Sequence, residues 1–258
     1  MRLKVIACKV FTREISLLAA RSDAVLDVTW IRQGLHNCPG LLREEIRREI
    51  RNAESDPDGP NRIARPPEDY SAIVLGFGLC SRAVSEITTS RLPLVVPRCH
   101  DCVGILLGSR RRYREFFDAH PGTYWLSPGW IEQATFPCGE QCAIMRSRYV
   151  EQFGEDNGEF LMRTEHEALR PYSRAVLVTW PELDRPEYHA RLAEVARDFG
   201  WDSECLEGDS GLLERMLNGV WDPEEVLVCP PGWSIEAGDD GDEVLRAVER
   251  AAARANDT

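Results

Sequence analysis

Short apolar runs rich in β-branched residues alternate with helical periodicity in the first part of the chain. Four runs have the length and composition of β-strands: residues 3–8, 25–31, 71–78 and 92–97. They are continuously apolar, which is typical of parallel strands buried on both faces of a sheet. Residues 12–22 and 40–54 lie between runs and have the spacing of amphipathic helices. This order predicts an α/β sheet covered by helices.

A similar alternation resumes after residue 173. Strands are predicted at 174–180, 201–208 and 224–232, and helices at 187–200, 210–221 and 242–255. Between the two alternating regions, a helix is predicted over 111–120, followed by one or two helices over 133–169 that break near Gly154 to Gly158. Residues 54–69 combine several prolines with charged residues, which predicts an exposed loop.

The repeated alternation predicts two Rossmann-like lobes with parallel sheets. Residues 1–135 form the first lobe, residues 136–172 a helical connection, and residues 173–258 the second lobe. The alternative is one doubly wound domain. In either arrangement we expect a functional site at the carboxyl edge of the strands, where open α/β sheets bind their ligands.

Net charge and hydropathy exclude several classes of partner. The net charge is −12 and the isoelectric point is near 5.0, so the overall field disfavours nucleic acids and anionic membranes. Apolar runs are too short for a membrane span, and the N-terminal run is too short for a secretory signal. We therefore expect a cytoplasmic protein that acts on a small-molecule substrate. In that reducing compartment the nine cysteines are expected to be thiols or ligands rather than disulfides.

Several cysteines and histidines follow the predicted strands of the first lobe. They are Cys8, His36, Cys38, Cys80, Cys99, His100 and Cys102. Because parallel strands end at one edge, we expect these residues to converge there. Thiolates with an imidazole suit Zn²⁺, and three or four thiolates can hold an iron–sulfur cluster. Glu14 and Asp101 follow strand ends and are candidate catalytic groups that orient a ligand or move a proton. Alternatively, either residue could be a helix cap or a surface charge.

Other interpretations of the cysteines stay open on the residues alone. Cys99 and Cys102 could form a redox pair, and with Cys138 and Cys142 they could form a four-cysteine zinc site. Cysteine is also often a small buried hydrophobe. Tyr124, Trp125, Trp130 and Trp233 lie near turns, where they could wall a ligand pocket or serve as packing anchors. His120, His166 and His189 are expected to be solvated.

Several segments in combination carry a family resemblance. The segments "IACKVFTRE", "GLHNCPGLL", "IVLGFGLCS", "VVPRCHDCVGILLGS" and "PGTYWLSPGW" resemble the DUF1638 family, over most of residues 3–130 and more loosely at "WDPEEVLVCPPG". The family pattern falls on Cys8, Glu14, His36, Cys80, Arg98, Asp101, Cys102, Gly108, Ser109 and Tyr113. It omits Cys38, Cys99, Cys138 and Cys142.

The resemblance implies a metal site made of Cys8, Cys80 and Cys102, with His36 as a fourth ligand. It also marks Arg98, Ser109 and Tyr113 as candidate cofactor-binding residues. Family members are associated with corrinoid-dependent methyl transfer, which implies a corrinoid protein or a methyltransferase as partner.

Three functions follow as hypotheses. The first is a zinc or iron–sulfur enzyme or accessory factor of one-carbon metabolism, for instance a metal-dependent methyltransferase. The second is a non-enzymatic module that binds a small molecule or a corrinoid protein. The third is a thiol redox protein that uses Cys99 and Cys102.

Overall fold

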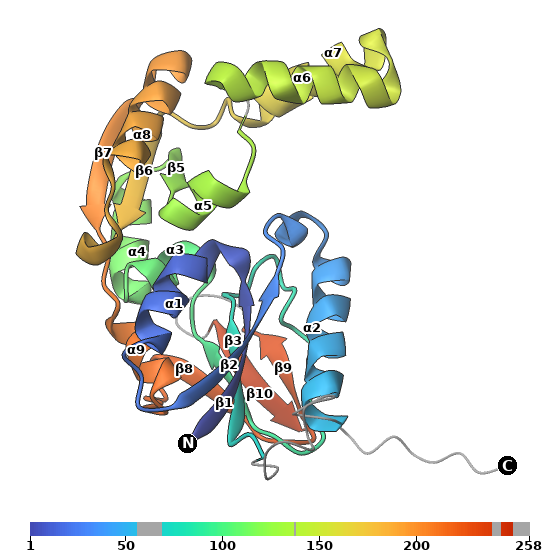
Figure 1. Cartoon of the computed structure of the whole chain (residues 1–258), viewed down its shortest axis with the longest axis vertical. Helices are drawn as coiled ribbons and strands as arrows, with labels where there is room; N and C mark the ends of the chain where they lie inside the picture. Colours follow the sequence, from blue (N-terminus) through green and yellow to red (C-terminus); the bar gives the residue numbers. More distant parts are fainter. Residues whose placement is uncertain (56–68, 137, 239–243, 250–258) are drawn as a thin grey trace, which may run out of the picture. The chain divides into compact units, whose positions relative to one another are not determined.

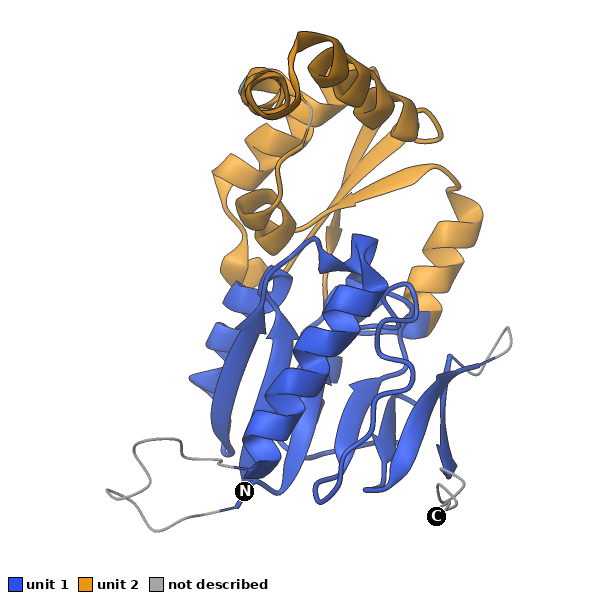
Figure 2. Ribbon diagram, turned by 90° about the vertical axis from the view of Figure 1, so that its right-hand side faces the viewer, with its two compact units in different colours: residues 1–110, 209–258 blue, residues 111–208 orange. Residues whose placement is uncertain are grey.

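The structure, a computed structural model, describes residues 1–55, 69–136, 138–238 and 244–249. Residues 1–110 and 209–258 form the first compact unit, and residues 111–208 form the second (Figure 2). The domain boundaries expected at 135/136 and 172/173 both fall inside the second unit. The segment 173–258 is divided between the two units.

The first unit is built on a five-stranded sheet in the order β2-β1-β3-β4-β8. Its strands are β1 (Arg2–Cys8), β2 (Val25–Ile31), β3 (Ala72–Gly76), β4 (Leu94–Pro97) and β8 (Val226–Cys229). The first four are parallel, and β8 pairs antiparallel with β4. Every residue of β3 and β4 is buried, as their continuous apolar sequence predicts. The α/β fold with parallel sheets is therefore confirmed.

Helices cover both faces of this sheet (Figure 1). They are α1 (Thr12–Ala19), α2 (Pro39–Ser55), α3 (Cys102–Leu106) and α9 (Gly211–Leu217), with short 3₁₀ turns η1 (Lys9–Phe11) and η2 (Leu35–Asn37). The apolar stripe of α2 packs with Ile6, Ile73 and Leu94 in one core cluster. In Figure 1, α1 and α9 lie side by side on the opposite face.

The sequence pattern predicts a helix over 242–255, and this prediction is wrong for the residues that the structure describes. Residues 245–249 form strand β10 (Leu245–Glu249), which pairs antiparallel with β9 (Trp233–Ala237). Leu245 is fully buried in the same core cluster as Ile235, so strand pairing and burial override a helical propensity. Residues 250–255 lie outside the described residues, as do residues 56–68 of the predicted loop.

The second unit contains a parallel three-stranded sheet in the order β5-β6-β7. Its strands are β5 (Thr123–Leu126), β6 (Arg174–Thr179) and β7 (Asp202–Glu207), and its helices are α4 (Arg110–Ala119), α5 (Pro128–Gln133), α6 (Gly139–Phe153), α7 (Glu155–Ala168) and α8 (Pro186–Phe199). A short turn, η4 (Pro181–Leu183), precedes α8. The predicted break near Gly154 is confirmed, because α6 ends there at φ +82° and α7 begins at the next residue. None of the described helices is long and apolar enough to cross a membrane.

Candidate functional site

The loops that follow β3 and β4 are hydrogen-bonded to each other at the carboxyl edge of the first sheet. The amide of Leu79 donates to the carbonyl of Cys99 at 2.8 Å, and the amide of Cys80 donates to the carbonyl of His100 at 3.0 Å. Gly78 lies so close to Asp101 that a Cβ on it would come within 2.7 Å of the Asp101 backbone. Because the two loops are paired, Cys80 lies near the start of α3, whose first residue is Cys102.

Three thiols at this edge share one electrostatic neighbourhood. Burial, together with the charges of Cys8 and Asp101, raises the pKa of Cys80 to about 12. Burial also raises the pKa of Cys102 well above its ordinary value, with further contributions from Asp101, Cys80 and Cys8. The pKa of Cys8 is raised by burial as well. The three side chains are therefore neutral thiols near pH 7, and deprotonating one opposes deprotonating the next.

The backbone at Cys80 adopts an unusual conformation. Cys80, Ser81 and Arg82 have φ values of 46°, 57° and 65°, in the left-handed region where a residue with a Cβ costs roughly 1–2 kcal/mol. Arg43 of α2 holds this turn by donating from its guanidinium to the carbonyl of Arg82 at 2.9 Å. Strain of this kind persists only where the surrounding structure enforces it, and it clusters at ligand-binding sites.

Asp101 is a helix cap at this edge. Its Oδ1 accepts from the amide of Val103 at 2.9 Å and from the amide of Gly104 at 3.3 Å. These bonds satisfy two amides in the first turn of α3 and fix the carboxylate beside the thiols. Of the roles expected for Asp101, these bonds confirm that of a helix cap.

The remaining predicted residues of this unit lie around the same strands. Glu14 is in the first turn of α1 and is 1% exposed. His36 is half-buried in η2, and burial lowers its pKa, which favours the neutral imidazole that metals bind.

Arg98 is hydrogen-bonded to backbone carbonyls: its Nε donates to Pro223 at 2.8 Å, and its Nη1 donates to Leu245. Ser109 is half-buried and lies one residue before the end of the first segment of this unit, residues 1–110.

Tyr113 belongs to the second unit. Its ring packs against Phe117 and Trp125, at centroid distances of 6.0 and 5.8 Å. It therefore forms part of an aromatic cluster on α4 and β5.

Among the described residues, no group of three or more His, Cys, Asp or Glu side chains is arranged to hold a metal ion. The three thiols share a neighbourhood without forming a closed ligand set in this conformation. A cysteine side chain can occupy three staggered χ1 rotamers, so the directions of the three sulfur atoms can change without a change in the backbone.

Cys99 differs from its neighbours. It is 2% exposed, and burial raises its pKa to about 12. Reactive redox cysteines have lowered pKa values and exposed sulfurs, so the environment of Cys99 disfavours a redox pair with Cys102.

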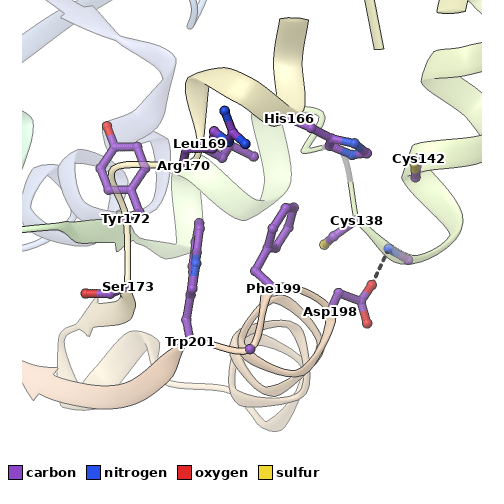
Figure 3. A pocket seen from close by; sticks show the side chains of 12 residues that line it. Cys138, Cys142, His166, Leu169, Arg170, Tyr172, Ser173, Asp198, Phe199 and Trp201 are labelled. Carbon is purple, nitrogen blue, oxygen red and sulfur yellow. Dashed lines mark hydrogen bonds between the residues drawn. The ribbon is translucent and has the colours of Figure 1, made fainter. Parts of the chain in front are cut away.

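The second unit contains a cavity of about 960 Å³ that the sequence did not reveal (Figure 3). It is lined by Cys138, Gly139, Cys142, His166, Leu169, Arg170, Tyr172, Ser173, Asp198, Phe199, Gly200 and Trp201. Phe199 and Trp201 stack with a centroid distance of 4.8 Å and form an aromatic wall. Asp198 accepts from the amide of Gly139 at 2.8 Å, which joins α8 to the start of α6.

The cavity wall differs from the expected aromatic wall. Tyr124 packs against Trp201 at 5.9 Å but is not a lining residue, and Trp125 contacts Phe116 of α4. Of the lining residues, Phe199 ends α8 and Trp201 follows it, and the sequence pattern there gives no indication of a cavity.

Parallel sheets covered by helices, with a polar site at a strand edge, place the chain among α/β proteins of Rossmann-like architecture. Residues 30–217 match the family described as "Protein of unknown function (DUF1638)". The chain therefore belongs to the DUF1638 family, as the sequence motifs predict.

A shorter similarity links the chain to ribonuclease HI of Halobacterium salinarum (strain ATCC 700922 / JCM 11081 / NRC-1). The two are 46% identical over 44 residues, which make up 16% of this chain and 22% of that protein. The chain thus spans about a fifth of the length of this relative. No solved structure matches the chain significantly.

Proposed function

We propose that Cys8, Cys80 and Cys102 bind a thiophilic metal centre, either Zn²⁺ or an iron–sulfur cluster, with His36 as a fourth ligand. The observation that carries the proposal is the gathering of the three thiols at the carboxyl edge, where the charge of Cys8 raises the pKa of Cys80 and the charges of Cys80 and Cys8 raise the pKa of Cys102. Thiols that hold their protons at neutral pH are weak nucleophiles, but a soft cation displaces those protons and takes the thiolates as ligands.

The chain's own residues suit such a centre. Asp101 is held by α3 beside the thiols and keeps a negative charge close to a cation. The strained turn at Cys80 sets the direction from which its sulfur approaches. Neutral His36 has the protonation state of a metal ligand. A bound Zn²⁺ lowers the pKa of a coordinated thiol and so presents a thiolate as nucleophile.

We further propose that the protein is an enzyme or accessory factor of corrinoid-linked methyl transfer, with a corrinoid protein or a methyltransferase as its partner. The support for this part is the resemblance to the DUF1638 family alone. In that role Glu14 and Asp101 are the candidate groups for orienting a small-molecule substrate or moving a proton.

Metal analysis and a visible spectrum of anaerobically purified protein test the proposal. Zinc predicts a colourless protein with about one ion per chain, and an iron–sulfur cluster predicts a brown protein. Cys8→Ser, Cys80→Ser and Cys102→Ser should each reduce the metal content. Cys38→Ser is the control, because Cys38 is exposed and is expected to leave the metal content unchanged. A metal-free wild type, or equal metal in all variants, contradicts the proposal.

The cavity of the second unit supports a second candidate function, a module that binds a small molecule. Ligand pockets are typically 300–1,000 Å³ with apolar walls and a few polar groups, and this cavity of about 960 Å³ has that character. Native mass spectrometry of the purified protein tests it. A co-purified small molecule that is lost in Trp201→Ala supports the function, and an identical mass in both proteins opposes it.

A further inference from the structure

Three side chains of the second unit form a hydrogen-bonded chain that the metal proposal does not use. The Sγ of Cys205 lies 3.4 Å from Nδ1 of His189. The Nε2 of His189 lies 2.8 and 2.9 Å from the two carboxylate oxygens of Asp184. We infer that Cys205, His189 and Asp184 form a nucleophilic thiol site that accepts an acyl group from an ester or a thioester.

Local structure explains why these residues meet. Cys205 pairs with Leu177 of β6, so both side chains point to the sheet face that α8 covers. Helix α8 buries Tyr188 and Leu192 against this face. His189 follows Tyr188 and lies at the border of that buried stripe, where it reaches the sulfur. The sequence predicts a solvated His189, and the structure leaves its side chain 42% exposed while also giving it two partners.

The hydrogen-bond pattern assigns a role to each group. A carboxylate only accepts, so Nε2 carries the hydrogen and Nδ1 presents its lone pair to the thiol. Asp184 therefore orients His189 and stabilises the imidazolium that forms when the ring takes a proton. The arrangement of a nucleophile, a base and a group that orients the base is the general signature of an activated nucleophile.

The surroundings of the sulfur allow a carbonyl substrate to approach. Cys205 is exposed, and the side chains of His189 and Asp184 are 42% and 40% exposed. Among the described strands, β7 is an edge of its sheet. Edge strands present backbone N–H groups that no neighbouring strand occupies, and such donors stabilise the oxyanion of an acyl-transfer intermediate.

The proposed step is balanced within the site. The Cys205 sulfur forms a bond to the acyl carbon, and the bond from that carbon to the alcohol oxygen or thiol sulfur breaks. The thiol proton moves to Nδ1 of His189 and then to the leaving group. The products are an acyl-Cys205 thioester and a free alcohol or thiol, and water later releases the acid and restores the thiol.

The protonation state of the Cys205 thiol determines which result the test should give. Burial, together with the charges of Asp184 and Glu204, raises the pKa of Cys205. Without assistance from a base, this shift would make Cys205 a slow nucleophile at neutral pH. Faster acylation at Cys205 than at another exposed cysteine therefore requires proton removal by His189. Cys38 is the internal comparison, because it is also exposed.

The experiment treats the full-length protein with p-nitrophenyl acetate at neutral pH and measures acetylation of each cysteine by peptide mass spectrometry. We expect Cys205 to react at least about tenfold faster than Cys38, since general-base assistance contributes a hundredfold or more in enzymes. His189→Gln should bring the rate at Cys205 to that of Cys38 or below, and Asp184→Asn should lower it to a smaller extent. The rate at Cys38 should stay the same in each variant.

Two results overturn the inference: a rate at Cys205 no greater than that at Cys38 in the wild type, or an unchanged rate at Cys205 in His189→Gln. Far-ultraviolet circular dichroism reports whether each variant is folded. If a variant is unfolded, the wild-type comparison of Cys205 with Cys38 still decides the inference. The site lies in the second unit, so its failure leaves the metal proposal unaffected.

Discussion

Replacing Gly78 with alanine tests how the structure assembles the thiol site. The added Cβ would lie 2.7 Å from the amide nitrogen and the Cα of Asp101 and 2.9 Å from its carbonyl carbon. Carbon atoms in contact are normally about 3.5–4.0 Å apart, so the two loops would have to separate by roughly 1 Å. Because the obstacle is backbone, no rotamer change relieves the clash.

The magnitude follows from three contributions. Overpacking of this kind costs about 1–3 kcal/mol. Separation would also stretch the hydrogen bonds from Leu79 to Cys99 and from Cys80 to His100, each contributing about 1 kcal/mol. Alanine restricts the unfolded chain and returns about 0.4–1 kcal/mol. We expect Gly78→Ala to lower the free energy of unfolding of the first unit by about 2–4 kcal/mol.

Urea unfolding followed by circular dichroism measures this change, and Gly40→Ala is the matched control. Gly40 lies in the first turn of α2, and no atom lies within 4 Å of the position that an alanine Cβ would take there. Alanine at this position should therefore be neutral or stabilising by up to about 1 kcal/mol. A free energy of unfolding for Gly78→Ala within about 0.5 kcal/mol of the wild type would refute the close packing of the two loops.

Two further substitutions probe the same unit. Burial would raise the pKa of Glu54, but hydrogen bonds from the amides of Arg91, Ser90 and Leu92 and from the Ser90 hydroxyl lower it below its ordinary value. Glu54→Gln should therefore lower the free energy of unfolding by about 1–2 kcal/mol at pH 7. This difference from the wild type should shrink as the pH falls below about 4.3. Urea midpoints at pH 7 and pH 4 measure the difference, and a constant value would contradict the hydrogen bonds assigned to Glu54. Asp101→Ala should destabilise the unit by about 0.5–2 kcal/mol. Asp101→Asn should retain most of the stability, because the asparagine oxygen also caps a helix. Equal thermal midpoints for the two variants would exclude a capping role.

The sequence predicts the parts of the fold that depend on local pattern. Continuous apolar runs identify the four parallel strands, and the carboxyl-edge rule brings Cys8, Cys80 and Cys102 into one neighbourhood. The rule works because parallel pairing fixes where each strand ends, whatever the loops contain. It does not give the rotation of each side chain, so the pattern could not show whether the thiols form a closed ligand set.

Features made by contacts between distant segments could not be predicted in this way. Strand β10 has a helical sequence pattern, and only its pairing with β9 and the burial of Leu245 make it a strand. The chain of Cys205, His189 and Asp184 depends on α8 packing over β7. A signal did exist in the sequence, because a buried helical stripe beside a strand places neighbouring polar residues at its border.

X-ray absorption at the metal edge of the anaerobically purified protein tests the central claim most directly, because it counts the sulfur atoms bound to the metal. For zinc, we expect three sulfur atoms at about 2.3 Å and one nitrogen or oxygen ligand, and we expect Cys80→Ser to reduce the sulfur count by one or to abolish binding. A protein without metal, or a metal bound by nitrogen and oxygen alone, would contradict the assignment of Cys8, Cys80 and Cys102 as ligands.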